Sequence, residues 1–121
     1  MAAADCLFCR IVAGSIPSKR VAIGEADLDR DLFAFEDQNP QAPHHVLIVP
    51  REHIATLNDL NGGHAALVGK LVLAASGIAK DRKIAEPGYR VLFNCNAGAG
   101  QTVFHIHLHL LGGRRLGWPP G

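Results

Sequence analysis

The most regular pattern in the chain is Val103-Phe104-His105-Ile106-His107-Leu108-His109-Leu110-Leu111. Side chains alternate between the two faces of a strand, so this period of two predicts a strand over 103–111 with three imidazoles on one face. The opposite, apolar face carries Phe104, Ile106, Leu108 and Leu110. Successive imidazoles start ~6.8 Å apart at Cα, close enough to act on one ligand. A half-exposed strand that happens to carry histidines is the alternative, but three in register favour a functional row.

The segment before this row is rich in small residues. Residues 94–102 read Asn-Cys-Asn-Ala-Gly-Ala-Gly-Gln-Thr, so backbone N–H groups near Gly100 can approach an anion without side chains in the way. Small residues serve a tight connection between two strands equally well. Because the loop directly precedes the histidine row, we expect a phosphate to bind between them.

Periodicity elsewhere predicts a single α+β domain over residues 1–121. A short helix is expected over 7–12 after Asp5 as N-cap, and a long helix over 64–81. Strands are expected over 21–26 and 31–36, joined as a hairpin through 27–30, and over 45–49 and 89–95. We expect residues 1–5 to be flexible and residues 112–121 to form an extended arm.

Composition excludes several classes of function. A chain of 121 residues has room for one domain, and its net charge of +1 comes from scattered basic residues, which argues against a nucleic-acid partner. Apolar stretches are interrupted well before the ~20 residues of a membrane span, so no membrane partner is expected. The N-terminus lacks a signal-peptide pattern, and three cysteines suit a reducing compartment, so a cytoplasmic location is expected.

Cys6 and Cys9 have the spacing of half a zinc site. Two further ligands must come from elsewhere in the chain, and His53 and His105 are the favoured candidates. A local zinc finger using His105 and His109 is excluded, since it would leave ~95 residues between the pairs. Two ordinary cysteines on a buried helix face are the alternative. His45 follows the Pro-rich segment 40–43 and can join the histidine cluster. Asp37 can bind a sugar diol or serve as a turn carboxylate.

Residues 101–111 resemble the His-x-His-x-His-x-x motif of the histidine triad (HIT) proteins. The resemblance runs from Cys6 to the end of the chain and points to the Hint branch, the nucleotide-binding phosphoramidases. It is carried by Asp37, Pro40-Gln41-Ala42-Pro43, His45, Leu47-Ile48-Val49-Pro50, Gly112-Gly113-Arg114 and Trp118-Pro119-Pro120-Gly121.

The resemblance implies a HIT fold, a five-stranded antiparallel sheet with one long and one or two short helices, pairing into a homodimer with a ten-stranded sheet. It also implies hydrolysis of the P–N bond of purine nucleoside 5′-phosphoramidates, such as AMP-lysine, through a nucleotidyl-histidine on His107. It assigns catalysis to His107, His109, His45 and Thr102, and substrate binding to Asn94, Gly100, Gln101, Asp37, Phe8, Ile11, Phe35 and Trp118.

In the members that carry Cys-x-x-Cys, the matching zinc ligands are Cys6, Cys9, His53 and His105, and the zinc is structural. Two positions depart from the Hint pattern. Gln38-Asn39 replaces an apolar residue and Ser, which bears on adenine or guanine preference, and Thr102 replaces Ser beside the leaving group.

Two other functions compete with the phosphoramidase. A zinc-dependent metallohydrolase is possible because two His at i and i+2 on a strand, with a third His, are also a catalytic zinc geometry. A non-catalytic nucleotide-binding or regulatory dimer module would keep the pocket without turnover.

Overall fold

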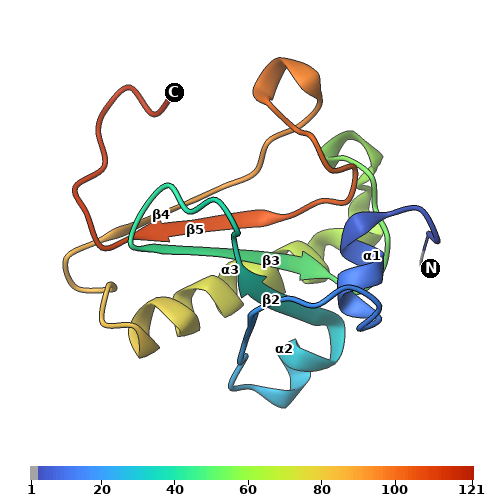
Figure 1. The fold of residues 1–121 in the computed structure, drawn as a ribbon, viewed down its shortest axis with the longest axis horizontal. Coiled ribbons are helices and arrows are strands. Elements are labelled where there is room, and N and C mark those ends of the chain that lie inside the picture. Colours follow the sequence, from blue (N-terminus) through green and yellow to red (C-terminus); the bar gives the residue numbers. More distant parts are fainter. Residues whose placement is uncertain (1–2) are drawn as a thin grey trace.

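The computed structural model describes residues 3–121. These residues form a five-stranded antiparallel sheet in the order β1-β2-β3-β5-β4 (Figure 1). The strands are β1 (Arg20–Val21), β2 (Leu32–Glu36), β3 (His44–Pro50), β4 (Tyr89–Leu92) and β5 (Leu108–Gly112). The helices are α1 (Leu7–Val12), α2 (Ala26–Asp31) and α3 (Ala65–Asp81), with 3₁₀ turns at Leu57–Asp59, Gly62–His64 and Ala97–Ala99. The predicted α+β fold is confirmed. Of the N-terminal segment expected to be flexible, Met1 and Ala2 lie outside the described residues.

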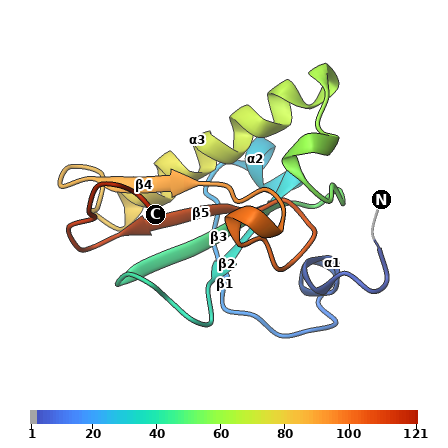
Figure 2. The same ribbon diagram turned by 90° about the horizontal axis from the view of Figure 1, so that it is seen from above.

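The sheet separates two apolar clusters, with α3 on one face and α1 on the other (Figure 2). Alternation along β3 builds both clusters, because Val46 and Ile48 pack toward α3 while Leu47 and Val49 pack toward α1. The cluster under α1 also contains Cys6, Phe8, Cys9, Ile11, Phe33 and Phe35. This second face carries the candidate site.

Helix α3 supplies the larger core. Its buried residues recur at helical spacing: Leu71, Ala74, Ala75, Ile78 and Ala79. By length and composition alone, Gly62–Asp81 is apolar enough to cross a membrane, with a mean hydropathy of 1.3 over the best window. Core helices pass the same test, and the packing of α3 against the sheet accounts for its buried apolar residues, whereas Val72 and Leu73 are exposed.

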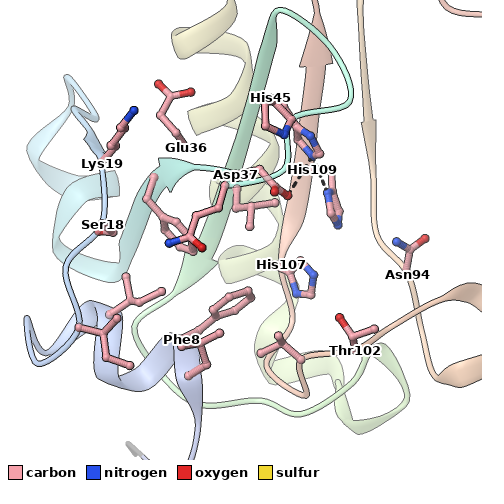
Figure 3. Close-up of a pocket in the computed structure, with 18 of the residues that line it drawn as sticks. Phe8, Ser18, Lys19, Glu36, Asp37, His45, Asn94, Thr102, His107 and His109 are labelled. Atoms are coloured by element: carbon pink, nitrogen blue, oxygen red, sulfur yellow. Dashed lines mark hydrogen bonds and ion pairs between the residues drawn. The ribbon is translucent and has the colours of Figure 1, made fainter.

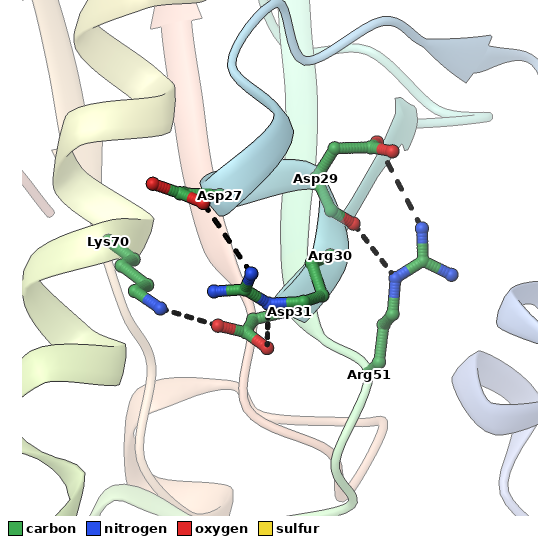
Figure 4. A network of polar contacts seen from close by, with 6 residues as sticks. All are labelled: Asp27, Asp29, Arg30, Asp31, Arg51 and Lys70. Carbon is green, nitrogen blue, oxygen red and sulfur yellow. Dashed lines mark hydrogen bonds and ion pairs between the residues drawn. The ribbon is translucent and has the colours of Figure 1, made fainter.

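The hairpin predicted between residues 21 and 36 is wrong. Residues 26–31 form helix α2, and in the segment before this helix only Arg20–Val21 pair with β2, in the expected antiparallel direction. Asp27 and Asp29 lie in the first turn, where carboxylates favour the positive end of the helix dipole, and Leu28 is buried. Ion pairs then hold α2 in place (Figure 4): Asp31 contacts Lys70 of α3, and this contact lowers the pKa of the Asp31 carboxyl.

The strand predicted over 103–111 is shorter than expected. Strand β5 begins at Leu108, so His105 and His107 precede it, and the N–H of Ile106 donates to the carbonyl of Ile54 at 2.7 Å. Phe104, predicted to be on the apolar face, is 47% exposed. Smaller shifts occur elsewhere: β4 ends at Leu92, Gly112 belongs to β5, and Cys6 replaces Asp5 as the N-cap of α1.

Candidate functional site

A cavity of about 1100 Å³ opens on the α1 face of the sheet, between α1, the ends of β2 and β3, and the loop before His107 (Figure 3). The structure brings most of the predicted site residues together in its wall. These are Phe8, Ile11, Phe35, Asp37, His45, Asn94, Gly100, Thr102, His107 and His109. Gln101 and Trp118 are not in this wall, and His105 lies in a separate cluster.

His107 is held in one tautomer by the backbone. Its Nδ1 lies 2.7 Å from the carbonyl oxygen of His105, and because a carbonyl can only accept, Nδ1 carries the proton. Burial lowers the pKa of His107, so the ring is neutral at pH 7 and its Nε2 keeps a lone pair. The ring also meets Phe8 edge-on, with centroids 5.0 Å apart. A neutral imidazole fixed in this way is a competent nucleophile.

His45 and His109 form a hydrogen-bonded pair beside His107. Nε2 of His45 lies 2.9 Å from Nδ1 of His109, and Asp37 Oδ2 lies 3.4 Å from the same Nε2 (Figure 3). Burial lowers the pKa of His45 and, with the neighbouring His107 and His45, lowers the pKa of His109 to about 4. The pair is therefore neutral at pH 7, and the ring of His109 lies 4.9 Å from that of His107.

The loop before His107 is shaped by Gln101, whose side chain is buried behind it. The Gln101 Oε1 accepts from the N–H of Asn96 at 2.7 Å, and its Nε2 donates to the carbonyls of Ala55 and Val103. Gly100, with φ of 89°, adopts the left-handed conformation that favours glycine. The amide of Gln101 therefore has three partners within the protein, and its predicted role in substrate binding stays a prediction.

Trp118 is 84% exposed on the arm after β5 and does not line the cavity. The arm has no helix or strand beyond Gly112, and Arg90 donates to the carbonyl of Gly117 at 2.8 Å.

Cys6, Cys9, His53 and His105 come together as a second cluster, next to the cavity, whose ligand atoms lie within 4.8 Å of one another. The two His Nδ1 atoms are 3.3 Å apart, and the Cys Sγ to His105 Nδ1 distances are 3.4 and 3.5 Å. Tetrahedral zinc with ordinary Zn–S and Zn–N bonds requires about 3.3–3.6 Å between such atoms. The residues therefore fit a four-coordinate metal.

The hydrogen bonding of His105 supports the same geometry. Its Nε2 donates to the carbonyl of Pro50 at 2.8 Å, so its Nδ1 lone pair faces the two sulfur atoms, as in many metal sites. Burial raises the pKa of the Cys6 thiol, so binding of a metal would displace its proton.

Comparison with known proteins agrees with these features. Residues 19–116 match the family model described as the HIT domain. The chain belongs to the HIT family. It is 44% identical to the purine nucleoside phosphoramidase of Escherichia coli K12 over 95% of this chain and 92% of that protein. It is also 44% identical to a HIT-like protein of Synechococcus elongatus, over 97% of each chain.

Solved HIT structures have the same fold. A HIT family hydrolase from Legionella pneumophila superposes with a TM-score of 0.90 at 49% identity, covering 97% of this chain and all (100%) of that one. A histidine triad protein from Clostridium difficile superposes with a TM-score of 0.88 at 38% identity, covering 97% of each chain.

Sequence reasoning missed part of the cavity of this HIT protein. Ile16, Ser18 and Lys19 line it, although they lie in an irregular segment between α1 and β1 that carries no motif. Gln38, noted only as a departure from the family pattern, also lines it. Proximity to Gly14 and Pro17 marks the segment as a connection, but only the fold shows that it faces the cavity.

Proposed function

We propose that this HIT protein is a hydrolase that cleaves the P–N bond of purine nucleoside 5′-phosphoramidates through a nucleotidyl-histidine on His107. The observation that carries the proposal is the hydrogen bond from His107 Nδ1 to the His105 carbonyl, because it leaves Nε2 unprotonated in the wall of the cavity. The name of the Escherichia coli relative supports the substrate class.

In the first step, His107 Nε2 attacks the α-phosphorus and the P–N bond breaks. The bonding pair goes to the leaving nitrogen, which takes the proton of the Thr102 hydroxyl. In the second step, water attacks the same phosphorus, one proton of the water returns to the Thr102 oxygen, His107 leaves as a neutral imidazole, and a nucleoside monophosphate is released. Covalent catalysis thereby divides one displacement into two easier ones.

The other cavity residues bind the substrate. Asn94, His109 and backbone N–H groups near Gly100 stabilise charge on the phosphoryl oxygens. Asp37 accepts hydrogen bonds from the ribose hydroxyls. The purine packs between apolar side chains of α1 and β2, namely Phe8, Ile11 and Phe35.

Zinc is proposed to have a structural role. Two Cys and two His complete a tetrahedron without an open position for substrate. The ion would tie α1 to the segments that carry His53 and His105, and no step of the reaction passes through it.

A homodimer is proposed from the edge of the sheet. Within residues 3–121, strand β4 pairs only with β5, and it exposes Tyr89 and Val91. Val72 and Leu73 of α3 are also exposed. Pairing of β4 with its copy would cover these residues, build a ten-stranded sheet, and allow the Trp118 arm to reach the partner's cavity. The free thiols of Cys6, Cys9 and Cys95 in this protein suit a cytoplasmic location.

The test is a turnover panel of adenosine and guanosine phosphoramidates with wild type and His107→Ala. We expect His107→Ala to lower kcat by ~10³-fold or more and to abolish the trapped nucleotidyl-protein. Full-yield trapping in His107→Ala would refute the assignment, and a wild type that binds nucleotide without releasing amine would favour the non-catalytic module.

The Asp37, His45 and His109 ligand atoms also lie close enough for a metal ion, which keeps the metallohydrolase testable. Turnover that survives a brief exposure to excess chelator would exclude it. Turnover that stops while the fold persists would favour it.

A further inference from the structure

The loop between β2 and β3 makes a hydrogen bond to the imidazole pair that the proposed reaction does not use. The backbone N–H of Gln41 donates to Nδ1 of His45 at 3.0 Å. A backbone amide nitrogen can only donate, so Nδ1 of His45 must carry the lone pair. Because His45 is buried and neutral, its single ring proton lies on Nε2.

The tautomer of His45 determines the tautomer of His109. Nε2–H of His45 donates to Nδ1 of His109 at 2.9 Å, so the proton of neutral His109 lies on its Nε2. That Nε2 is buried and has no hydrogen-bond partner among residues 3–121. Buried donors are rarely left without an acceptor, and His109 lines the cavity beside His107. A phosphoryl oxygen of the substrate could accept the hydrogen bond that Nε2–H of His109 lacks.

The opposite tautomer would reverse the chain of donors. With the proton of His45 on Nδ1, His109 would have to donate from its own Nδ1, and its Nε2 would present a lone pair to the phosphate. A donor to the developing negative charge would then become a repulsive acceptor. One proton position at His45 therefore decides whether His109 assists the reaction.

Two charged groups near His45 also bear on its proton. Asp37 Oδ2, 3.4 Å from His45 Nε2, favours the same tautomer, and Glu36 acts on the ring at longer range. However, Asp37 Oδ1 already accepts from the N–H of Asn39 at 2.8 Å, and the ribose is proposed to bind this carboxylate. The bond from Gln41 does not involve a group that the substrate engages.

The C-terminal arm holds Gln41 from the other side. Nε of Arg114 donates to the carbonyl of Gln41 at 3.0 Å. The preceding Gly113 has φ of 92°, and a Cβ there would lie 2.9 Å from Cβ of Pro43 and 3.0 Å from Cδ2 of His44. The arm therefore packs directly on the loop, and both backbone groups of Gln41 have fixed partners.

We propose that the Gln41 backbone N–H, held by Arg114 of the arm, is a positioning group that fixes the tautomer of His45 and so presents Nε2–H of His109 to the substrate phosphate. The proposal rests on the proposed function for its effect on turnover. The tautomers themselves are properties of the free protein.

The first measurement is long-range ¹H–¹⁵N NMR of the histidine rings in the free wild type at pH 7.5. We expect both His45 and His109 as Nε2–H tautomers. Gln41→Pro removes the N–H, and Gln41→Ala is the matched variant that retains it. We expect mixed tautomers for His45 and His109 in Gln41→Pro and the wild-type tautomers in Gln41→Ala. In turnover assays we expect the kcat of Gln41→Pro to be about 10²-fold lower than that of wild type, with KM changed much less.

Arg114→Ala tests the same link without altering the loop, with Arg115→Ala as a control that removes a neighbouring exposed cation. We expect partial mixing and a kcat about 10-fold lower in Arg114→Ala, and no change in Arg115→Ala. If Gln41→Pro does not fold, Arg114→Ala decides. Nδ1–H tautomers in wild type, or unchanged tautomers in folded Gln41→Pro and Arg114→Ala, would overturn the proposal. If wild type hydrolyses no phosphoramidate, the proposed function fails while the tautomers still test this inference.

Discussion

Acidification should destabilise the protein through His109, by an amount that one variant can isolate. Burial beside His107 and His45 lowers the pKa of His109 from 6.5 to about 4. The unfolded chain therefore binds this proton more tightly than the native protein does, so the free energy of unfolding falls as the pH falls from 6.5 toward 4. At pH 5 the loss is about 2 kcal/mol. Because the ring borders an open cavity, solvent screening reduces the expected loss to about 1 kcal/mol.

The assay is urea unfolding of wild type and His109→Gln at pH 7.5 and pH 5. Gln is polar and close in size but cannot titrate, so the stability of the variant should fall by about 1 kcal/mol less than that of wild type. His109 is not in the Cys6, Cys9, His53 and His105 cluster, so loss of metal at low pH affects both proteins and cancels in the comparison. Equal pH dependence in the two proteins would show that His109 is not held neutral by burial.

Three further outcomes are expected. Cys9→Ser should lower the zinc content per subunit, measured by elemental analysis, and the melting temperature, measured by thermal unfolding. Turnover in a rate assay should persist at moderate temperature, and an unchanged melting temperature would contradict the proposed zinc site. Leu73→Arg should convert a dimer to a monomer in light scattering, and a dimeric mass would place the interface elsewhere. Gln101→Ala should lower the free energy of unfolding by about 1–3 kcal/mol in urea titration, because it leaves Asn96 N–H and two carbonyls without their partner.

The parts of the fold that follow from periodicity were predictable. Alternation along β3 and the helical spacing of α3 reflect burial on a sheet face and on a helix face, and both are local properties of the sequence. Residues 26–31 were misassigned because a short polar segment is equally compatible with a chain reversal between strands and with a short helix. The contact of Asp31 with Lys70, 39 positions away, is not visible in the local pattern.

The site was predictable to the extent that its residues form motifs. Cys6, Cys9, His53 and His105 do come together, as the motif and the resemblance implied. The orientation of Gln101 was not predictable, because its amide is directed by the carbonyl of Ala55, 46 positions away. The same holds for Gln41, whose importance comes from a backbone group that any residue but proline supplies.

The irregular backbone of residues 105–107 connects the cluster of Cys6, Cys9, His53 and His105 to the ring of His107. In a regular strand the carbonyl of His105 would bond to a neighbouring strand, whereas here it accepts from Nδ1 of His107. The same departure lets the N–H of Ile106 bond to Ile54, next to the ligand His53. His105 thus contacts Cys6 and Cys9 through its ring and fixes His107 through its carbonyl. A substitution that displaced the backbone of His105 would therefore also loosen the bond that keeps the lone pair of His107 on Nε2.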